Sequence, residues 1–167
     1  MADRCSASIT IGGTLGAEHL PAFFAAIADE DLRVDFDEEA FTPEDLISGE
    51  PLTLCAHEVS WGTFNVLEPF CQTHKLPYKR WNGACGGVWG CGRSVYRGDN
   101  DATGGAAKTH EYDVSEDDQI LLGAGLAHHL GSFEAILAHL GEADFSVPPL
   151  VIVPEQSPQM ATTAIQA

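Results

Sequence analysis

Ser6-Ala-Ser-Ile-Thr-Ile-Gly12 alternates polar and apolar residues, which is typical of a strand with one buried face. The pair Gly12-Gly13 ends this strand and predicts a turn. A helix up to about Asp29 should follow, because apolar residues recur there at helical spacing and Pro21 suits a first turn. The residues predicted to form its buried face are Leu20, Phe23, Phe24 and Ile27.

Strands and helices are predicted in alternation along the rest of the chain. The predicted strands cover residues 32–36, 51–59, 76–81, 88–89, 94–97 and 148–153. The predicted helices cover residues 42–49, 64–71, 115–122 and 133–140, and Pro69 either kinks the second of these or marks its true start. Residues 98–107 are predicted to form a polar loop.

This order of elements predicts a single α+β domain over residues 1–153. Its sheet should be mixed or antiparallel with helices packed on it, and it should contain at least one β-α-β unit, with a ferredoxin-like arrangement as one form. Residues 154–167 are small or polar and predict a disordered tail. No internal repeat is found.

The composition favours a globular cytoplasmic protein. Hydrophobic residues make up 44% of the 167, which is enough for a packed core. No apolar run reaches the roughly 18 residues that a membrane span requires, and the first residues do not resemble a secretory signal. In the cytoplasm the five cysteines should be reduced.

The charge balance is strongly acidic. Twenty-five Asp and Glu face eight Lys and Arg, which gives a formal net charge of −17. Direct binding to DNA, RNA or anionic lipid is therefore disfavoured, because each requires a basic surface. A basic partner is favoured through electrostatic steering, although the same charge would also serve solubility alone.

Residues 29–45, here called the acidic segment, concentrate this charge around a single basic residue, Arg33. A fixed array of carboxylates can imitate the phosphate charges of DNA, so the acidic segment is the candidate contact region. The alternatives are a solvated face without a partner, and a calcium site at Asp35, Asp37 and Glu39 that lacks the usual Gly and bidentate Glu of such loops. The nine candidate carboxylates are Asp29, Glu30, Asp31, Asp35, Asp37, Glu38, Glu39, Glu44 and Asp45.

A second region is basic and aromatic. No acid lies between Glu68 and Asp99, while Lys, Arg, Trp and Tyr residues are frequent there. Such a stretch could bind single strands by stacking, or bind the acidic half of a second copy. We favour a simpler interpretation, in which the aromatic residues pack the core and the bases pair with acids.

Four side chains have the chemistry of zinc ligands: Cys71, His74, Cys85 and Cys91. The first two lie one helical turn apart, but the second two are separated by five residues, which is loose for a structural zinc site. Cys55 and His57 could replace members of the set. The alternative is that these cysteines are ordinary buried or surface thiols.

Two segments match enzymatic motifs only in part. Cys71 and His74 could form a nucleophile and base on one helix face, although nothing else in the sequence selects them. The segment from Gly12 to Gly16 follows a strand and precedes a helix as a phosphate loop does, but it lacks the Lys-Ser/Thr ending and is interpreted as a turn. We therefore expect no catalytic residues.

Several segments resemble small acidic proteins of bacteriophages and mobile elements. These are Ile9-Thr-Ile-Gly-Gly-Thr-Leu15, Phe41-Thr-Pro-Glu-Asp-Leu46, Leu54-Cys55 and Phe70-Cys-Gln-Thr-His-Lys-Leu-Pro-Tyr78. The resemblance covers about the first half of the chain, and residues 83–92 depart from it. By analogy it implies an antagonist of host defence, of the anti-CRISPR or anti-restriction kind, and it assigns no site residues.

The leading functional hypothesis is a non-enzymatic inhibitor. Its acidic segment would occupy the DNA-binding surface of a basic nucleic-acid-binding protein, such as a CRISPR or restriction complex in a bacterial cell. The second hypothesis is a zinc-stabilised protein-binding adaptor, and the third is an enzyme whose site the sequence does not reveal. Neither the target nor the oligomeric state follows from the sequence.

Overall fold

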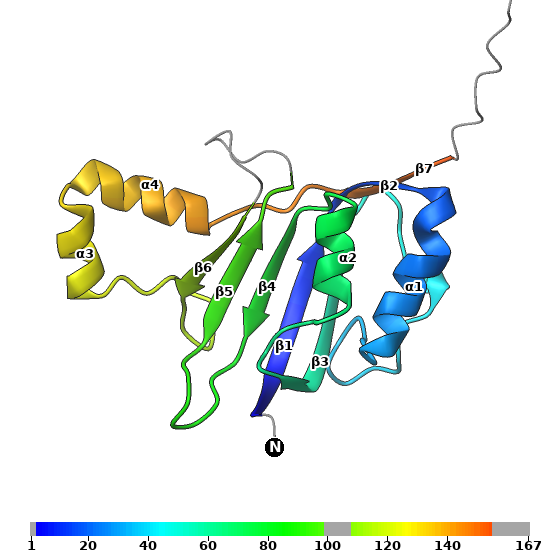
Figure 1. Cartoon of the computed structure of the whole chain (residues 1–167), viewed down its shortest axis with the longest axis horizontal. Helices are drawn as coiled ribbons and strands as arrows, with labels where there is room; N and C mark the ends of the chain where they lie inside the picture. Colours follow the sequence, from blue (N-terminus) through cyan, green and yellow to red (C-terminus); the bar gives the residue numbers. More distant parts are fainter. Residues whose placement is uncertain (1–2, 99–107, 155–167) are drawn as a thin grey trace, which may run out of the picture.

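The computed structural model describes residues 3–98 and 108–154 (Figure 1). Its main sheet, the larger of the two in the described chain, has five strands in the order β3-β1-β4-β5-β6, and every neighbouring pair is antiparallel. The strands are β1 (Arg4–Ile11), β3 (Leu52–Ser60), β4 (Tyr78–Asn82), β5 (Gly92–Tyr96) and β6 (Thr109–Asp113). The predicted single α+β domain is confirmed.

Strand β1 lies inside the main sheet, between β3 and β4. The alternation that predicted it is confirmed, because Ala7, Ile9 and Ile11 are completely buried while the residues between them are half-exposed. The register places Ile9 beside Leu54 of β3 and Arg80 of β4. The same face of the sheet therefore changes from apolar to charged within two strands.

The predicted β-α-β unit is present in a split form. Strands β3 and β4 are both antiparallel to β1, so they run parallel to each other with β1 between them. They are joined through helix α2 (Leu67–Thr73). A second unit of the ferredoxin-like kind does not form around helix α1 (Leu20–Asp29), because the main-sheet strands that flank it in the chain, β1 and β3, are antiparallel neighbours.

Helices α1 and α2 cover one face of the main sheet (Figure 1). The predicted apolar stripe of α1 is confirmed, with Phe23 and Ile27 fully buried and Leu20 and Phe24 packed at the margin. Pro69 is the third residue of α2, so it marks the start of that helix, where a missing N–H costs little. Phe64 belongs to the core but precedes the helix.

The predicted turn at Gly12-Gly13 is instead the entry to a small parallel sheet. Strand β2 (Gly13–Gly16) pairs with β7 (Leu150–Val153), which confirms the predicted last strand and accounts for Gly12 to Gly16 as a strand rather than a phosphate loop. The chain passes very close to itself here, since a Cβ on Gly12 would lie 1.8 Å from the carbonyl oxygen of Pro148. Only glycine permits this approach.

The second helical pair lies at the β6 end of the main sheet (Figure 1). Helix α3 (Ala124–Leu130) and helix α4 (Phe133–Ala143) follow one another after Gly123, and Ser132 caps α4 by accepting a hydrogen bond from the Ala135 N–H. Ala143 packs with Val95 and Tyr112 on the sheet face opposite to α1 and α2. The helices therefore cover the two faces of the main sheet at different ends of the sheet.

Three predicted elements are wrong or shortened. Residues 32–36 do not form a strand, because the segment bends after Arg33, which makes isolated bridges to Cys55 of β3 and to Ala40. The helix predicted from Ser115 is a turn, held by the Ser115 N–H bonding to Gln119, and the helix starts only beyond Gly123. The helix predicted at 42–49 is the short 3-10 helix η2 (Pro43–Asp45); another 3-10 turn, η1 (Ala17–His19), precedes α1.

Several other predictions have mixed outcomes. Val88-Trp89 lies in the loop between β4 and β5, with one bridge from Cys85 to Trp89. Strand β6 was not predicted, although Tyr112 and Val114 alternate with polar residues. Residues 99–107 of the predicted loop and residues 155–167 of the predicted tail lie outside the described residues. Within the described chain, no helix has the length and apolar character needed to span a membrane.

Replacing Gly12 by Ala should lower the free energy of unfolding by about 1–3 kcal/mol, because the added methyl group would collide with the Pro148 carbonyl and separate β2 from β7. The matched control is Gly141→Ala in α4, where a Cβ has open space and should raise stability by up to about 1 kcal/mol. Urea denaturation of both variants measures the change in the free energy of unfolding. Equal stability of the two would contradict the close approach at Gly12.

Candidate functional site

The acidic segment is folded against the edge of the main sheet. Arg33 exchanges two main-chain hydrogen bonds with Cys55 of β3, at 3.0 and 2.8 Å, and the Phe41 N–H bonds to the Leu32 carbonyl at 2.8 Å. Leu32 is fully buried, and Val34 and Phe41 pack against the core. The segment is therefore anchored at several points, and its carboxylates project from a defined backbone.

Two of the nine predicted contact residues have structural roles. The Glu30 carboxylate accepts hydrogen bonds from the N–H groups of Val66 and Leu67, at 2.6 and 3.3 Å, at the start of α2. The Asp45 carboxylate accepts from the N–H and hydroxyl groups of Thr42, at 2.7 and 3.0 Å. Both carboxylates satisfy donors at helix starts, as capping residues do.

The other seven carboxylates are exposed: Asp29, Asp31, Asp35, Asp37, Glu38, Glu39 and Glu44. Asp31 lies 3.4 Å from the guanidinium of Arg33, a surface pair of little energetic weight. Asp37, Glu38, Glu39 and Asp45 line a shallow hollow of about 400 Å³ with Val34, Ala40 and Thr42. The lining residues described for this hollow include no Lys or Arg, so it is suited to a cationic group.

The basic residues of the aromatic region are engaged inside the protein. Arg80 pairs with Glu68, and the Nε of Arg93 lies 2.8 Å from Asp118. The guanidinium of Arg97 lies 4.6 Å from the centre of the Phe145 ring. The expectation that these bases are paired is therefore confirmed for Arg80 and Arg93, and Tyr78 and Tyr96 are buried in the core as expected.

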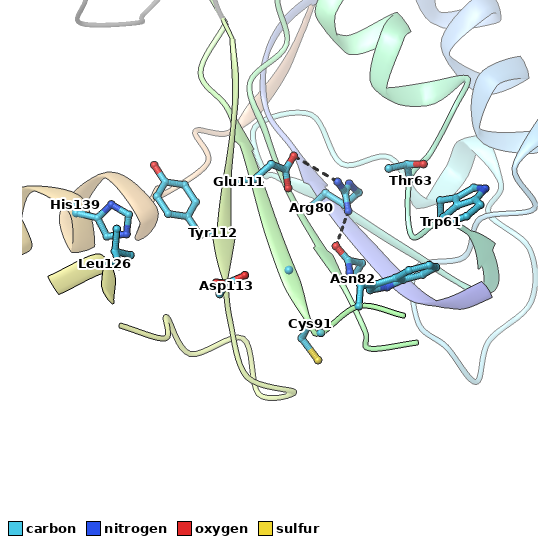
Figure 2. A pocket seen from close by; sticks show the side chains of 13 residues that line it. Trp61, Thr63, Arg80, Asn82, Cys91, Glu111, Tyr112, Asp113, Leu126 and His139 are labelled. Atoms are coloured by element: carbon cyan, nitrogen blue, oxygen red, sulfur yellow. Dashed lines mark hydrogen bonds and ion pairs between the residues drawn. The ribbon is translucent and has the colours of Figure 1, made fainter. Parts of the chain in front are cut away.

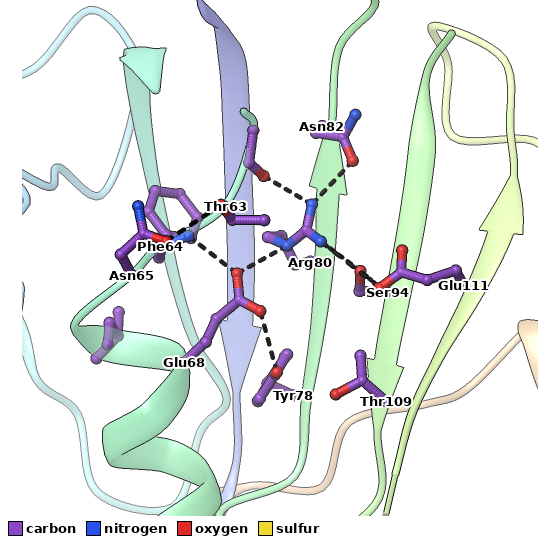
Figure 3. A network of polar contacts seen from close by, with 12 residues as sticks. Thr63, Phe64, Asn65, Glu68, Tyr78, Arg80, Asn82, Ser94, Thr109 and Glu111 are labelled. Atoms are coloured by element: carbon purple, nitrogen blue, oxygen red, sulfur yellow. Dashed lines mark hydrogen bonds and ion pairs between the residues drawn. The ribbon is translucent and has the colours of Figure 1, made fainter. Parts of the chain in front are cut away.

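The pair of Glu68 and Arg80 is the centre of a buried polar network (Figure 3). Arg80 Nε lies 2.8 Å from Glu68 Oε1, and both residues are at least 90% buried. The carboxylate also accepts from the Phe64 N–H at 2.9 Å and the Tyr78 hydroxyl at 3.1 Å. Burial and the nearby Glu68 charge raise the pKa of Tyr78, which keeps its hydroxyl a donor.

The other guanidinium nitrogens of Arg80 connect the network across the sheet. One donates to the Gly62 carbonyl at 2.7 Å and the Asn82 side chain at 2.8 Å. The other donates to the Ser94 hydroxyl, which in turn donates to Glu111. Arg80, Ser94 and Glu111 are direct neighbours on β4, β5 and β6, so the network extends from the core to the exposed edge of the sheet.

The predicted zinc site is not assembled. In the described part of the chain, no group of three or more His, Cys, Asp or Glu side chains is placed to hold a metal ion, which also applies to the calcium alternative. Cys71 and His74 lie before β4, whereas Cys85 and Cys91 lie after it. A five-residue strand spans roughly 15 Å, which separates the two pairs.

The structure also gives no support for a thiol nucleophile at Cys71. Burial and the nearby Glu68 charge raise the pKa of this thiol, so it stays protonated and unreactive. Its proposed partner His74 packs against His19, with ring centroids 4.4 Å apart, and desolvation and the His19 charge lower its pKa. These two histidines line a separate hollow with Gly16 and Glu18.

A larger hollow, which the sequence did not predict, lies over the β4-β5-β6 part of the main sheet (Figure 2). Its volume is about 550 Å³, and it reaches α3 and α4 at Leu126 and His139. Its lining includes Trp61, Asn82, Trp89, Glu111 and Asp113. The available signals were the Trp61-Gly62 and Trp89-Gly90 pairs and the alternation of Glu111 and Asp113 in β6, but only strand pairing brings them together.

Replacing Glu68 by Gln should lower the free energy of unfolding by about 3–5 kcal/mol, because the buried Arg80 charge loses its close, buried counter-ion and keeps only the exposed Glu111. The same substitution at Glu111, which is exposed and 3.8 Å from Arg80, should cost less than about 1 kcal/mol. Thermal and urea denaturation measure the stability of the two variants. Similar losses would mean that the Glu68 charge does not stabilise the network.

Mild alkylation of the folded protein should label Cys85 first. This thiol is half-buried, whereas Cys5, Cys55, Cys71 and Cys91 are buried, and burial raises the pKa of the first three of these. Mass spectrometry after brief iodoacetamide treatment identifies the labelled residue, and Cys85→Ser should remove the fast phase. Labelling of Cys71 at the same rate would be inconsistent with the packing of α2.

Comparison with protein-family models, with curated proteins and with solved structures finds no match to this chain. The resemblance to phage proteins therefore stays a prediction, and the function must be argued from the geometry.

Proposed function

We propose that this protein is a non-enzymatic binding protein whose acidic segment occupies a basic, nucleic-acid-binding surface of another protein. In the form predicted from the sequence, the partner is a host-defence complex of the CRISPR or restriction type in the bacterial cytoplasm. The single observation that carries the proposal is the anchored acidic segment, with seven exposed carboxylates and an acidic hollow.

Anchoring of the backbone supports this proposal over a merely solvated loop. A flexible acidic loop would lose conformational entropy on binding, whereas a pre-organised array loses less. The hydrogen bonds from Arg33 to Cys55 and the capping contacts of Glu30 and Asp45 fix the segment before any partner arrives. The remaining carboxylates are then available for charge-assisted contacts with Lys and Arg side chains.

The distribution of the basic residues supports the same proposal. Arg80 and Arg93 are buried in ion pairs, so their charges contribute little to the outer surface. Because Glu68 and Asp118 are paired with them, the formal net charge of −17 is unchanged, and the outer surface carries it with fewer exposed basic groups. Such a surface steers basic partners and repels nucleic acid, which suits a competitor of nucleic acid better than a nucleic-acid-binding protein.

The zinc-stabilised adaptor, which was the second hypothesis, has less support. No described group of side chains could hold the metal, and Cys71 belongs to the buried face of α2. An adaptor without zinc would still use the acidic segment. It differs from the inhibitor only in whether nucleic acid competes for the captured partner.

The proposal is tested with the variant Asp35→Lys, Asp37→Lys, Glu38→Lys and Glu39→Lys. The four side chains are exposed and cap no helix, so the fold should persist while affinity for the partner falls at least about a hundredfold, as several charge pairs are lost. The measurement is capture from bacterial lysate at low and high salt, identification by mass spectrometry, and titration of the captured protein.

A matched control reverses four exposed acids far from the acidic segment in sequence: Glu116, Asp117, Glu134 and Glu142. Both variants change the net charge equally, so a loss of partner affinity in the first variant alone would identify the acidic segment as the binding region. Addition of DNA should displace the captured partner if the surface is a nucleic-acid site. Retention of the partner by the first variant, or capture that neither salt nor DNA affects, would contradict the proposal.

A further inference from the structure

The hollow over the β4-β5-β6 part of the sheet exists because one residue of its floor has no side chain (Figure 2). Gly92 is paired with Asn82 on one side and Asp113 on the other, so these three positions form one row across the sheet. A Cβ on Gly92 would lie 2.9 Å from the Asn82 side-chain oxygen. Glycine thus keeps open a space that any other residue would fill.

Two indole rings form one wall of this hollow. The centroids of the Trp61 and Trp89 rings are 5.4 Å apart, with an angle of 32° between the ring planes. The Trp89 ring N–H donates to the Gly83 carbonyl at 3.2 Å. Because this donor is already used, Trp89 can contact a ligand only through the π surface of its ring. The wall is therefore aromatic and electron-rich.

The conformation of Trp61 is unusual for a bulky residue. Its φ is +57°, in the left-handed region, and 56% of the residue is exposed. Left-handed backbone at a large side chain costs free energy, and such residues gather at functional sites. The Trp61 N–H bonds to the Asp3 carbonyl at 2.9 Å and the Gly62 N–H to the Val59 carbonyl at 3.2 Å, so main-chain contacts hold this conformation and leave the indole exposed where it lines the hollow.

The opposite wall is acidic. Glu111 and Asp113 point from β6 toward the same face of the sheet and both are exposed. The charge of Arg80, which also lines the hollow, is already balanced by Glu68 at 2.8 Å. The lining is therefore net negative next to an aromatic pair, and that combination attracts cations through both the carboxylates and the indole faces.

We propose that this hollow binds an organic cation with an alkylated ammonium or guanidinium head, which the two indoles and the two carboxylates hold between them. The cation comes either from a small molecule or from a Lys or Arg side chain of a partner. The site is built from β4, β5, β6, two loops and helices α3 and α4, and it does not include the acidic segment, so it is independent of the function proposed above.

Isothermal titration of the full chain compares cations with neutral molecules of the same shape. Choline is paired with 3,3-dimethyl-1-butanol, and butylguanidine with butylurea. At least one cation should bind about fivefold more tightly than its neutral counterpart, or better, since contact between a cation and an aromatic ring contributes this much. A short Arg- or Lys-containing peptide that binds more tightly than either small cation would identify a partner side chain as the source.

Variants locate the binding. Trp61→Ala and Asp113→Asn should each weaken cation binding by about threefold to tenfold, whereas Trp81→Phe on the other face of β4 should leave it unchanged. Circular dichroism verifies that the variants fold. Replacing Asp35, Asp37, Glu38 and Glu39 by Lys should also leave cation binding unchanged, which separates this site from the acidic segment.

Two results would overturn the inference. The first is equal affinity of both cations and their neutral counterparts for the unmodified protein. The second is cation binding that survives both Trp61→Ala and Asp113→Asn without loss, which would place the cation on the general acidic surface instead.

Discussion

The buried contact between Glu68 and Arg80 is the constraint on which the arrangement of the domain depends. Glu68 lies on α2 and Arg80 on β4, so the ion pair fixes the height and rotation of the helix over the sheet. Neither charge could be buried without the other, because the desolvation of an unpaired ion would exceed any gain from packing. The polar atoms of the pair also bond to Phe64, Tyr78, Gly62, Asn82 and Ser94, which satisfies most of the donors and acceptors of the two side chains.

This network also determines how charge is distributed over the molecule. Arg80 and Arg93 are directed inward, so the positive charges of the aromatic region stabilise the fold rather than the surface. The acids are mostly left outside, in the acidic segment and on β6. Because each of these Arg residues is paired with an acid, the net acidity of the exterior follows from the composition, and both proposed sites use this exterior to attract positive groups.

Local patterns in the sequence correctly predicted the elements that depend on interactions between residues close in the chain. The alternation of Ile9 and Ile11, the helical stripe of Phe23 and Ile27, and the spacing of Thr42 and Asp45 all have counterparts in the structure. The parallel pairing of β2 with β7 and the row from Arg80 to Glu111 join residues far apart in the chain, and no local pattern encodes such pairs. The zinc ligands were grouped by residue type alone, although the strand predicted at residues 76–81, which forms β4, already separated Cys71 from Cys85. The acidic segment was visible as composition, but the capping roles of Glu30 and Asp45 depend on tertiary contacts.

The short pairing of Arg33 with Cys55 has a consequence for how this protein behaves at high concentration. Strand β3 is an outer strand of the main sheet, and an outer strand with free N–H and C=O groups can recruit a strand from a neighbouring molecule. Arg33 occupies the middle of that edge with its own main chain, and the like charges that follow it repel an approaching copy. The segment therefore also protects the domain from sheet-to-sheet aggregation, so that changes in its backbone would promote fibril-like association even where they leave the core intact.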